Sequence, residues 1–100
     1  MSLPYQVILL SSAEPVDPTN TNLDVEVSFE DDRRYGATFA TPDNIASLMR
    51  PYESSGECGA GLYFWSSALI VIKDCSRHSI EECVASLLAE GEFEDAFSRL

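Results

Sequence analysis

The chain of 100 residues has few basic side chains, and this lack excludes several functions. Six Lys and Arg residues stand against 17 Asp and Glu residues, so the formal net charge is −11 at pH 7. Residues 1–50 carry eight acids and three bases, and residues 51–100 carry nine and three. Affinity for nucleic acid comes largely from Lys and Arg that displace counterions from phosphates, and anionic membranes attract the same residues. The sequence therefore predicts no binding to nucleic acid or to membranes, and it favours a basic protein partner.

The chain also lacks long apolar runs and paired cysteines. No stretch approaches the roughly 20 apolar residues that a membrane-spanning helix needs. The start, MSLPYQVILL, has no basic segment and a short apolar one, so it resembles a first strand more than a signal peptide. The cysteines, Cys58, Cys75 and Cys83, are odd in number and widely spaced. That pattern favours reduced thiols, and with them a cytoplasmic location, over a disulfide framework.

Recognisable catalytic and ligand-binding motifs are missing as well. Nothing beyond residue type pairs the one histidine, His78, with a thiol nucleophile, and the spacing of the Cys and His residues matches no zinc pattern. The segment DDRRYG lacks the spacing of a Ca²⁺ loop, and GECGAG does not link a strand to a helix as phosphate-binding loops do. The sequence thus predicts no catalytic residues, no metal, no cofactor and no enzymatic activity. The alternative is a small ligand-binding module or enzyme with a site near Cys58 and His78.

Strand patterns fill most of the first forty residues. The apolar content of 45% is normal for a globular protein, and the length predicts a single domain over residues 1–100. Residues 5–10 read as a strand and residues 11–22 as a loop. Apolar and polar residues alternate in 23–30 and again in 34–40, which is typical of half-buried strands. A three-residue loop, at 30–32 or at 31–33, keeps the apolar side chains of both strands on one face, whereas a two-residue loop separates them.

Two later segments carry helix-start signals. Thr41 is the predicted N-cap of a helix that has Pro42 at its first position and ends near Arg50. Ser76 predicts the cap of a second helix, with Ser79 as a competing cap, and Gly91 is the residue expected just after its end. The stripe expected to face the core consists of Ile80, Val84, Leu87 and Leu88. A further amphipathic turn or two is expected to bury Phe93, Phe97 and Leu100.

The segment between these helices predicts a flexible loop over 53–61 and then a hairpin of two strands, about 62–66 and 69–73. The order of elements is therefore β-β-β-α-β-β-α-α. This order predicts an α+β domain with an antiparallel-rich sheet of four to five strands and with helices packed on one face.

Tyr63, Phe64 and Trp65 stand side by side in this second hairpin. In a strand, Tyr63 and Trp65 point to one face and Phe64 to the other, so the three rings cannot form one platform. The apolar run 69–72 has no polar alternate, so both of its faces need cover, and helices cover only one. We therefore expect the 62–73 hairpin to be the structural centre. Tyr63 or Trp65 is expected to stay partly exposed at a contact with a partner or with a second copy in a homodimer. Burial on both faces and a ligand pocket are the alternatives.

Acidic side chains gather on the polar side of the 23–30 strand and around the junction near the C-terminus. The candidates for a protein interface at these two places are Asp24, Glu26, Glu90, Glu92, Glu94 and Asp95. Together with Tyr63 and Trp65 they would attract and hold a basic partner. The alternative is a hydrated surface that only keeps the protein in solution.

The segments YFW, LIVIKD and LLAEGEFEDAF resemble small uncharacterised bacterial α+β proteins of acidic character. In size, acidity and lack of catalytic residues the chain is also similar to bacterial immunity proteins and antitoxins. That resemblance implies a protein without catalytic activity that blocks a toxin by binding it, often a basic nuclease. It implies no role for any single residue.

Overall fold

The central hairpin pairs β2 (Asn22–Phe29) with β3 (Arg34–Ala40). The computed structural model describes residues 4–10 and 17–100, so residues 11–16 of the first predicted loop lie outside it. The Phe29 N–H donates to the Arg33 carbonyl at 2.9 Å, which closes a loop of residues 30–32. Asp32 in this loop has a φ of 67°, the left-handed conformation that three-residue hairpin loops use at this point. The predicted loop is confirmed, and the pairs Val25–Ala37 and Val27–Tyr35 share one face.

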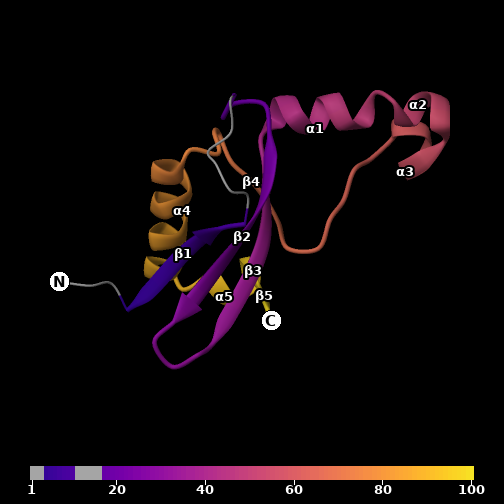
Figure 1. Cartoon of the computed structure of the whole chain (residues 1–100). Helices are drawn as coiled ribbons and strands as arrows, with labels where there is room; N and C mark the ends of the chain where they lie inside the picture. The colour runs from indigo at the N-terminus through magenta and orange to yellow at the C-terminus, as the bar shows by residue number, and fades with distance from the viewer. Residues whose placement is uncertain (1–3, 11–16) are drawn as a thin grey trace.

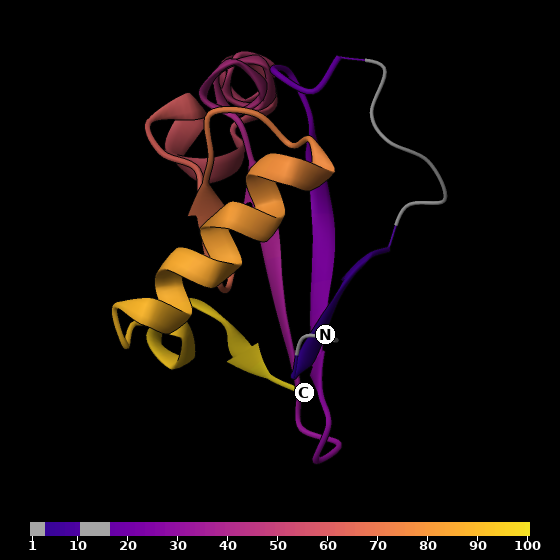
Figure 2. The same cartoon turned by 90° about the vertical axis from the view of Figure 1, so that its left-hand side faces the viewer.

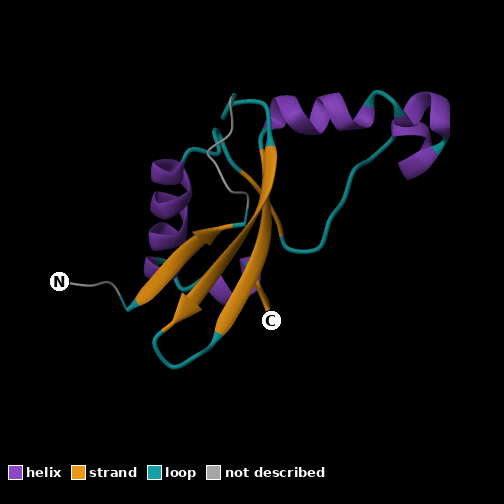
Figure 3. Ribbon diagram, viewed as in Figure 1, coloured by secondary structure: helices purple, strands orange, loops and turns teal. Residues whose placement is uncertain are grey.

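Further strands lie on both sides of this hairpin (Figure 3). β1 (Tyr5–Leu9) pairs antiparallel with β2 at one edge. On the other side of β3, β4 (Leu69–Val71) pairs in parallel with residues 38–40, and β5 (Ser98–Arg99) pairs antiparallel with residues 35 and 36. The sheet has five strands in the order β1-β2-β3-β4, with β5 beside β3. The predicted α+β class with a mainly antiparallel sheet is confirmed.

One face of the sheet is covered by α4 (Arg77–Ala89) and α5 (Phe93–Ala96) (Figure 2). Ser76 caps α4 by accepting from the Ser79 N–H at 3.2 Å, so the first of the two predicted caps forms. Gly91 ends the helix with a φ of 74° as predicted, and the Glu92 N–H returns to the Leu87 carbonyl at 2.9 Å. The core between helices and sheet comprises Leu23, Val25, Val27, Tyr35, Ala37, Phe39, Cys75, Ile80, Val84, Phe93 and Phe97.

The helices α1 (Pro42–Met49), α2 (Tyr52–Ser55) and α3 (Glu57–Gly61) extend beyond the end of the sheet as an arm (Figure 1). Thr41 and Pro42 start α1 as predicted, and Arg50 ends it. No residue of α1 is buried, and the molecule measures 50 × 27 × 23 Å. The prediction that helices pack on one face of the sheet therefore holds for α4 and α5. It does not hold for the helices of the arm, which lie apart from that face. The prediction of a flexible loop over 53–61 is wrong, because α2 and α3 include every residue of that range except Gly56.

The predicted 62–73 hairpin does not form. Residues 62–66 have no strand structure, and of the two predicted strands only β4 is present, over Leu69–Val71. Because the arm carries the chain away from the sheet, residues 62–68 are used as the return segment, and they deliver β4 parallel to β3. The structural centre is the β2–β3 hairpin instead, whose inward side chains are buried.

Leu100 was expected to be buried and is 66% exposed, so that expectation is wrong. Its N–H donates to the Arg34 carbonyl at 2.8 Å, which continues the β5–β3 pairing. Phe97 points into the core, and Leu100 lies on the opposite face of the sheet, over Gly36. A Cβ atom on Gly36 would lie 3.3 Å from Leu100 Cδ2.

Candidate protein-interaction surfaces

The return segment exposes large apolar side chains in a row. Leu62 is 80% exposed, Tyr63 50% and Trp65 69%, while Phe64 is half-buried. Residues 62–65 are called the aromatic segment below. The Tyr63 N–H donates to the Cys58 carbonyl at 3.3 Å, so the segment starts against α3. Since these residues form no strand, the expected assignment of Tyr63 and Trp65 to one sheet face does not apply.

The arm presents a second set of apolar side chains. Ile45, Leu48, Met49 and Tyr52 recur at helical spacing, and each is half-buried. None of the four belongs to the described hydrophobic core. A helix in a globular protein normally buries such a stripe against the rest of the domain. Here the stripe stays at the surface of the arm, which also leads into the aromatic segment.

Asp24 and Glu26 lie on the open face of the sheet, where β3 supplies partners for both. The Thr38 hydroxyl donates to Asp24 Oδ1 at 2.8 Å. The Arg34 guanidinium forms an ion pair with Glu26 and donates from Nε at 2.7 Å. From the sequence, this face was described only by the acidic side chains of the 23–30 strand. That description was incomplete, because β3 adds a cation and a hydroxyl that the alternation in 23–30 could not reveal.

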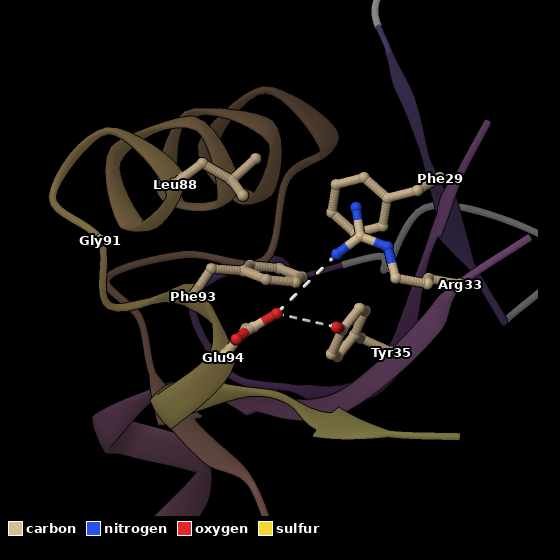
Figure 4. Close-up of a pocket in the computed structure, with 7 residues that line it drawn as sticks. All are labelled: Phe29, Arg33, Tyr35, Leu88, Gly91, Phe93 and Glu94. Carbon is tan, nitrogen blue, oxygen red and sulfur yellow. Dashed lines mark hydrogen bonds and ion pairs between the residues drawn. The ribbon is translucent and has the colours of Figure 1, made fainter. Parts of the chain in front are cut away.

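Glu94 ties the C-terminal turn to the hairpin (Figure 4). Its Oε1 accepts from the Tyr35 hydroxyl at 3.0 Å and lies 3.8 Å from Arg33 Nη1. The Arg33 guanidinium stands 4.8 Å from the centre of the Phe29 ring. Phe93 packs edge-to-face on Tyr35 with ring centres 5.1 Å apart. A hollow of about 290 Å³ remains among these groups, at the small end of ligand sites. We interpret this cluster as a structural contact between the C-terminal turn and the hairpin and not as a ligand site, because its polar groups already bind one another.

The other acids near the C-terminus lie on the outside of the α4–α5 junction. Glu90, Glu92 and Asp95 are all exposed. Over residues 4–10 and 17–100, no basic side chain forms an ion pair with any of the three. The predicted interface residues thus lie on different elements: the aromatic segment follows α3, Asp24 and Glu26 lie on β2, and the remaining acids lie at the α4–α5 junction. Asp24 lines one hollow together with Ser67 and Ala68, which follow the aromatic segment in the chain.

Cys58 and His78 are not brought together. Cys58 lies in α3 at the tip of the arm, and His78 lies in α4 on the far side of the sheet (Figure 1). The exposed His78 ring pairs with Glu82 at 3.2 Å, one helical turn along. Burial and, secondarily, Asp74 raise the pKa of the Cys75 thiol to about 11, and burial also raises that of Cys83. Within the described residues no three His, Cys, Asp or Glu side chains gather as metal ligands would.

A groove between β1 and α4 escaped the sequence analysis. It has a volume of about 670 Å³, and Tyr5 and Val7 meet Glu81 and Ala85 across it. The position of β1 at the edge of the sheet creates this groove. No local pattern in residues 5–10 encodes an edge position, although the short Ala85 beside two glutamates was a weak signal on the helix side.

Comparisons of the chain with protein-family models, with curated proteins and with solved structures found no significant match. In the described part of the chain, no helix has the length and apolar character needed to cross a bilayer.

Proposed function

We propose that this protein is a non-catalytic interaction domain that binds a basic protein partner, as immunity proteins and antitoxins do. The observation that carries the proposal is the aromatic segment, with Leu62, Tyr63 and Trp65 at least half exposed on a chain of net charge −11. Contiguous exposed apolar side chains on a soluble domain mark contact sites. Trp and Tyr are the residues that most often dominate the energy of such contacts.

Charge and apolar surface have different tasks in this proposal. The acidic charge accelerates the encounter with a cationic partner and discriminates against acidic ones. The aromatic segment then supplies apolar area that leaves water on binding. The half-buried stripe of α1, with Ile45 and Met49, is a second apolar area on the arm. Free Cys58, Cys75 and Cys83 thiols support a reducing compartment such as the cytoplasm as the place of action.

A pull-down with matched variants tests the proposal. The immobilised protein is exposed to a bacterial lysate at low and at high salt, beside the double variant Leu62→Ser/Trp65→Ser. The control is Leu10→Ser/Val71→Ser, which removes two apolar side chains that are 60% and 57% exposed outside the aromatic segment. We expect a basic protein that is retained by the wild type and by the control, is lost with the aromatic-segment variant and weakens in high salt.

Trp65 gives an independent readout, because it is the one tryptophan of the chain. Binding of the purified partner at the aromatic segment removes water from the indole and shifts its emission to shorter wavelength. A captured partner that is acidic, or that leaves the Trp65 emission unchanged, contradicts the proposal. Equal capture by the aromatic-segment variant and its control does so as well.

A further inference from the structure

β1 is the outer strand of the sheet, and half of its backbone groups point away from β2. The Leu10 N–H donates to the Asp24 carbonyl at 3.1 Å, and the Glu30 N–H donates to the Pro4 carbonyl at 3.2 Å. In an antiparallel pair the hydrogen-bonded residues alternate with the others. Residues 4, 6, 8 and 10 therefore bond to β2. The N–H and C=O groups of Tyr5, Val7 and Leu9 point outward, as the groups on an open edge do.

The groove described above is lined by residues of β1 and of α4. Figure 2 shows the two elements from the side. Tyr5 and Val7 line its strand side. Its helix side carries Glu81, Glu82 and the short Ala85, and Arg77 and His78 also line it, with Arg77 3.3 Å from Glu81 and His78 3.2 Å from Glu82. Both glutamates are exposed and Ala85 has no bulk beyond Cβ. A groove between an edge strand and a helix offers a main-chain template on one wall and side-chain selection on the other.

Arg77 indicates which chemistry this edge accepts. Its Nη1 donates to the outward carbonyl of Val7 at 3.3 Å and also contacts Glu81 Oε1 at 3.3 Å. A cationic N–H donor thus already lies between an edge carbonyl and a carboxylate. A partner that brings a backbone N–H to Val7 and a Lys or Arg side chain to Glu81 would supply the same two interactions.

We propose that the β1–α4 groove binds an extended, cationic segment of a partner protein as an added strand beside β1. The inference rests on the proposed function and names a second contact surface, separate from the aromatic segment. The added strand bonds to the outward backbone groups of Tyr5, Val7 and Leu9 and displaces Arg77 from the Val7 carbonyl. Its apolar side chains pack on Tyr5, Val7 and Ala85, and its basic side chains meet Glu81 and Glu82.

Charge argues for this occupant and against a second copy of the chain. Two copies joined edge to edge would bring together molecules of net charge −11 each. The joint would also place the Glu81 and Glu82 pairs of both copies along one seam. Like charges across an interface oppose association, whereas a cationic segment gains from the same carboxylates.

The probe is a peptide of about seven residues with threonine at every second position and with lysine and valine taking turns at the others, long enough to match an edge strand. Lysine and valine then both project to the α4 side of the added strand. Amide hydrogen exchange with the full chain reads out binding. We expect protection of the Tyr5, Val7 and Leu9 amides, while the Trp65 emission stays constant. A peptide with N-methyl groups on the residues that face β1 cannot donate to the edge, and we expect it to bind at least about tenfold more weakly.

Two variants probe the helix wall without touching the core. Ala85→Arg fills the groove and adds a positive charge, so we expect at least about tenfold weaker binding of the lysine–valine peptide. Ser86→Arg is the matched control, because it adds the same charge at an exposed position of α4 outside the groove, and we expect it to bind like the wild type. Circular dichroism confirms that both variants are folded.

Each outcome bears on the inference. Equal binding of the N-methylated peptide, equal binding to Ala85→Arg, or binding without protection of the Tyr5, Val7 and Leu9 amides overturns it. A peptide-free dimer whose β1 amides are already protected also overturns it, in favour of a second copy. If a basic partner shifts the Trp65 emission while the peptide leaves β1 unprotected, the groove inference fails and the proposed function stands. If the peptide protects β1 but the captured basic partner itself leaves the Trp65 emission unchanged, the groove inference stands and the proposed contact at the aromatic segment fails.

Discussion

The Thr41 hydroxyl joins the sheet to the helical arm by accepting the backbone N–H of Thr21 at 3.2 Å. The same hydroxyl accepts the Asn44 N–H at 3.4 Å and so caps α1. The backbone N–H of Thr41 donates to the Thr21 carbonyl at 3.1 Å. Among the described residues, Thr41 is the one polar residue that is buried, and it is fully buried. One side chain therefore accepts from the residue before β2 and from the first turn of α1, at the point where the arm leaves the sheet.

Replacement of Thr41 by Val should lower the free energy of unfolding by about 1–3 kcal/mol, because two backbone donors lose their acceptor while the shape is kept. Urea unfolding followed by circular dichroism measures this loss. Thr41→Ser is the control, since it keeps the hydroxyl and should retain more of the stability. A Thr41→Val variant as stable as the wild type would mean that the hydroxyl does not hold this junction.

Gly91 is expected to tolerate substitution poorly for a reason of backbone geometry alone. It has a φ of 74° after α4, and no atom lies within 4 Å of where a Cβ would stand. Gly91→Ala therefore meets no steric contact and should still cost about 1–2 kcal/mol, because a residue with a Cβ is strained in the left-handed region. Gly91→Asn should cost less. Thermal unfolding of the two variants gives the comparison, and the opposite order of stability would count against this account.

Local signals explain which parts of the fold were predictable. The alternation in 23–30 and 34–40 restricts β2 and β3 to registers with an odd loop, at 30–32 or at 31–33, because an odd loop alone keeps Val27 and Tyr35 on one face. The start of α1 at Thr41 and the end of α4 at Gly91 rest on single residues with strong positional preferences. Such features need no knowledge of distant parts of the chain.

Features that depend on distant partners were not predictable. Residues 62–66 have the composition of a strand, but a strand needs a neighbour, and the edge of β3 is taken by β4 and β5. The same holds for the site residues. The partners of Glu26 and Glu94, which are Arg34 and Tyr35, follow from pairing and packing across the chain. The groove beside β1 exists because β1 lies at the edge, which is a property of the whole sheet.

Two aromatic truncations should separate core from surface. Phe39 is fully buried, with its ring centre 6.0 Å from that of Phe97, so Phe39→Ala should cost about 3–5 kcal/mol of stability. Trp65 is 69% exposed, and Trp65→Ala should change the stability by less than about 0.5 kcal/mol. Urea unfolding followed by circular dichroism measures both. A large loss for Trp65→Ala would show that the aromatic segment holds the monomer together, and that would remove the basis for treating it as a contact surface.

Cys75 should make the protein less stable in alkali. Its thiol is fully buried, and burial and then the nearby Asp74 raise its pKa to about 11, above the ordinary value of 9.0. Below pH 9 the thiol is protonated in both the folded and the unfolded chain, so it adds no dependence on pH. Between pH 9 and pH 11 the unfolded chain releases this proton while the folded chain keeps it. The free energy of unfolding should therefore fall by about 1.4 kcal/mol per pH unit from this group in that interval.

Urea unfolding of the wild type and of Cys75→Ala at several pH values from 8 to 11 isolates the effect of this thiol. Tyr, Lys and the remaining Cys side chains titrate in both proteins, so their contribution cancels in the difference. We expect a constant difference in stability below pH 9, set by the lost sulfur atom in the core, and a shift in favour of Cys75→Ala as the pH rises further. Parallel stability curves up to pH 11 would mean that the folded protein lets the Cys75 thiolate form as readily as the unfolded chain does.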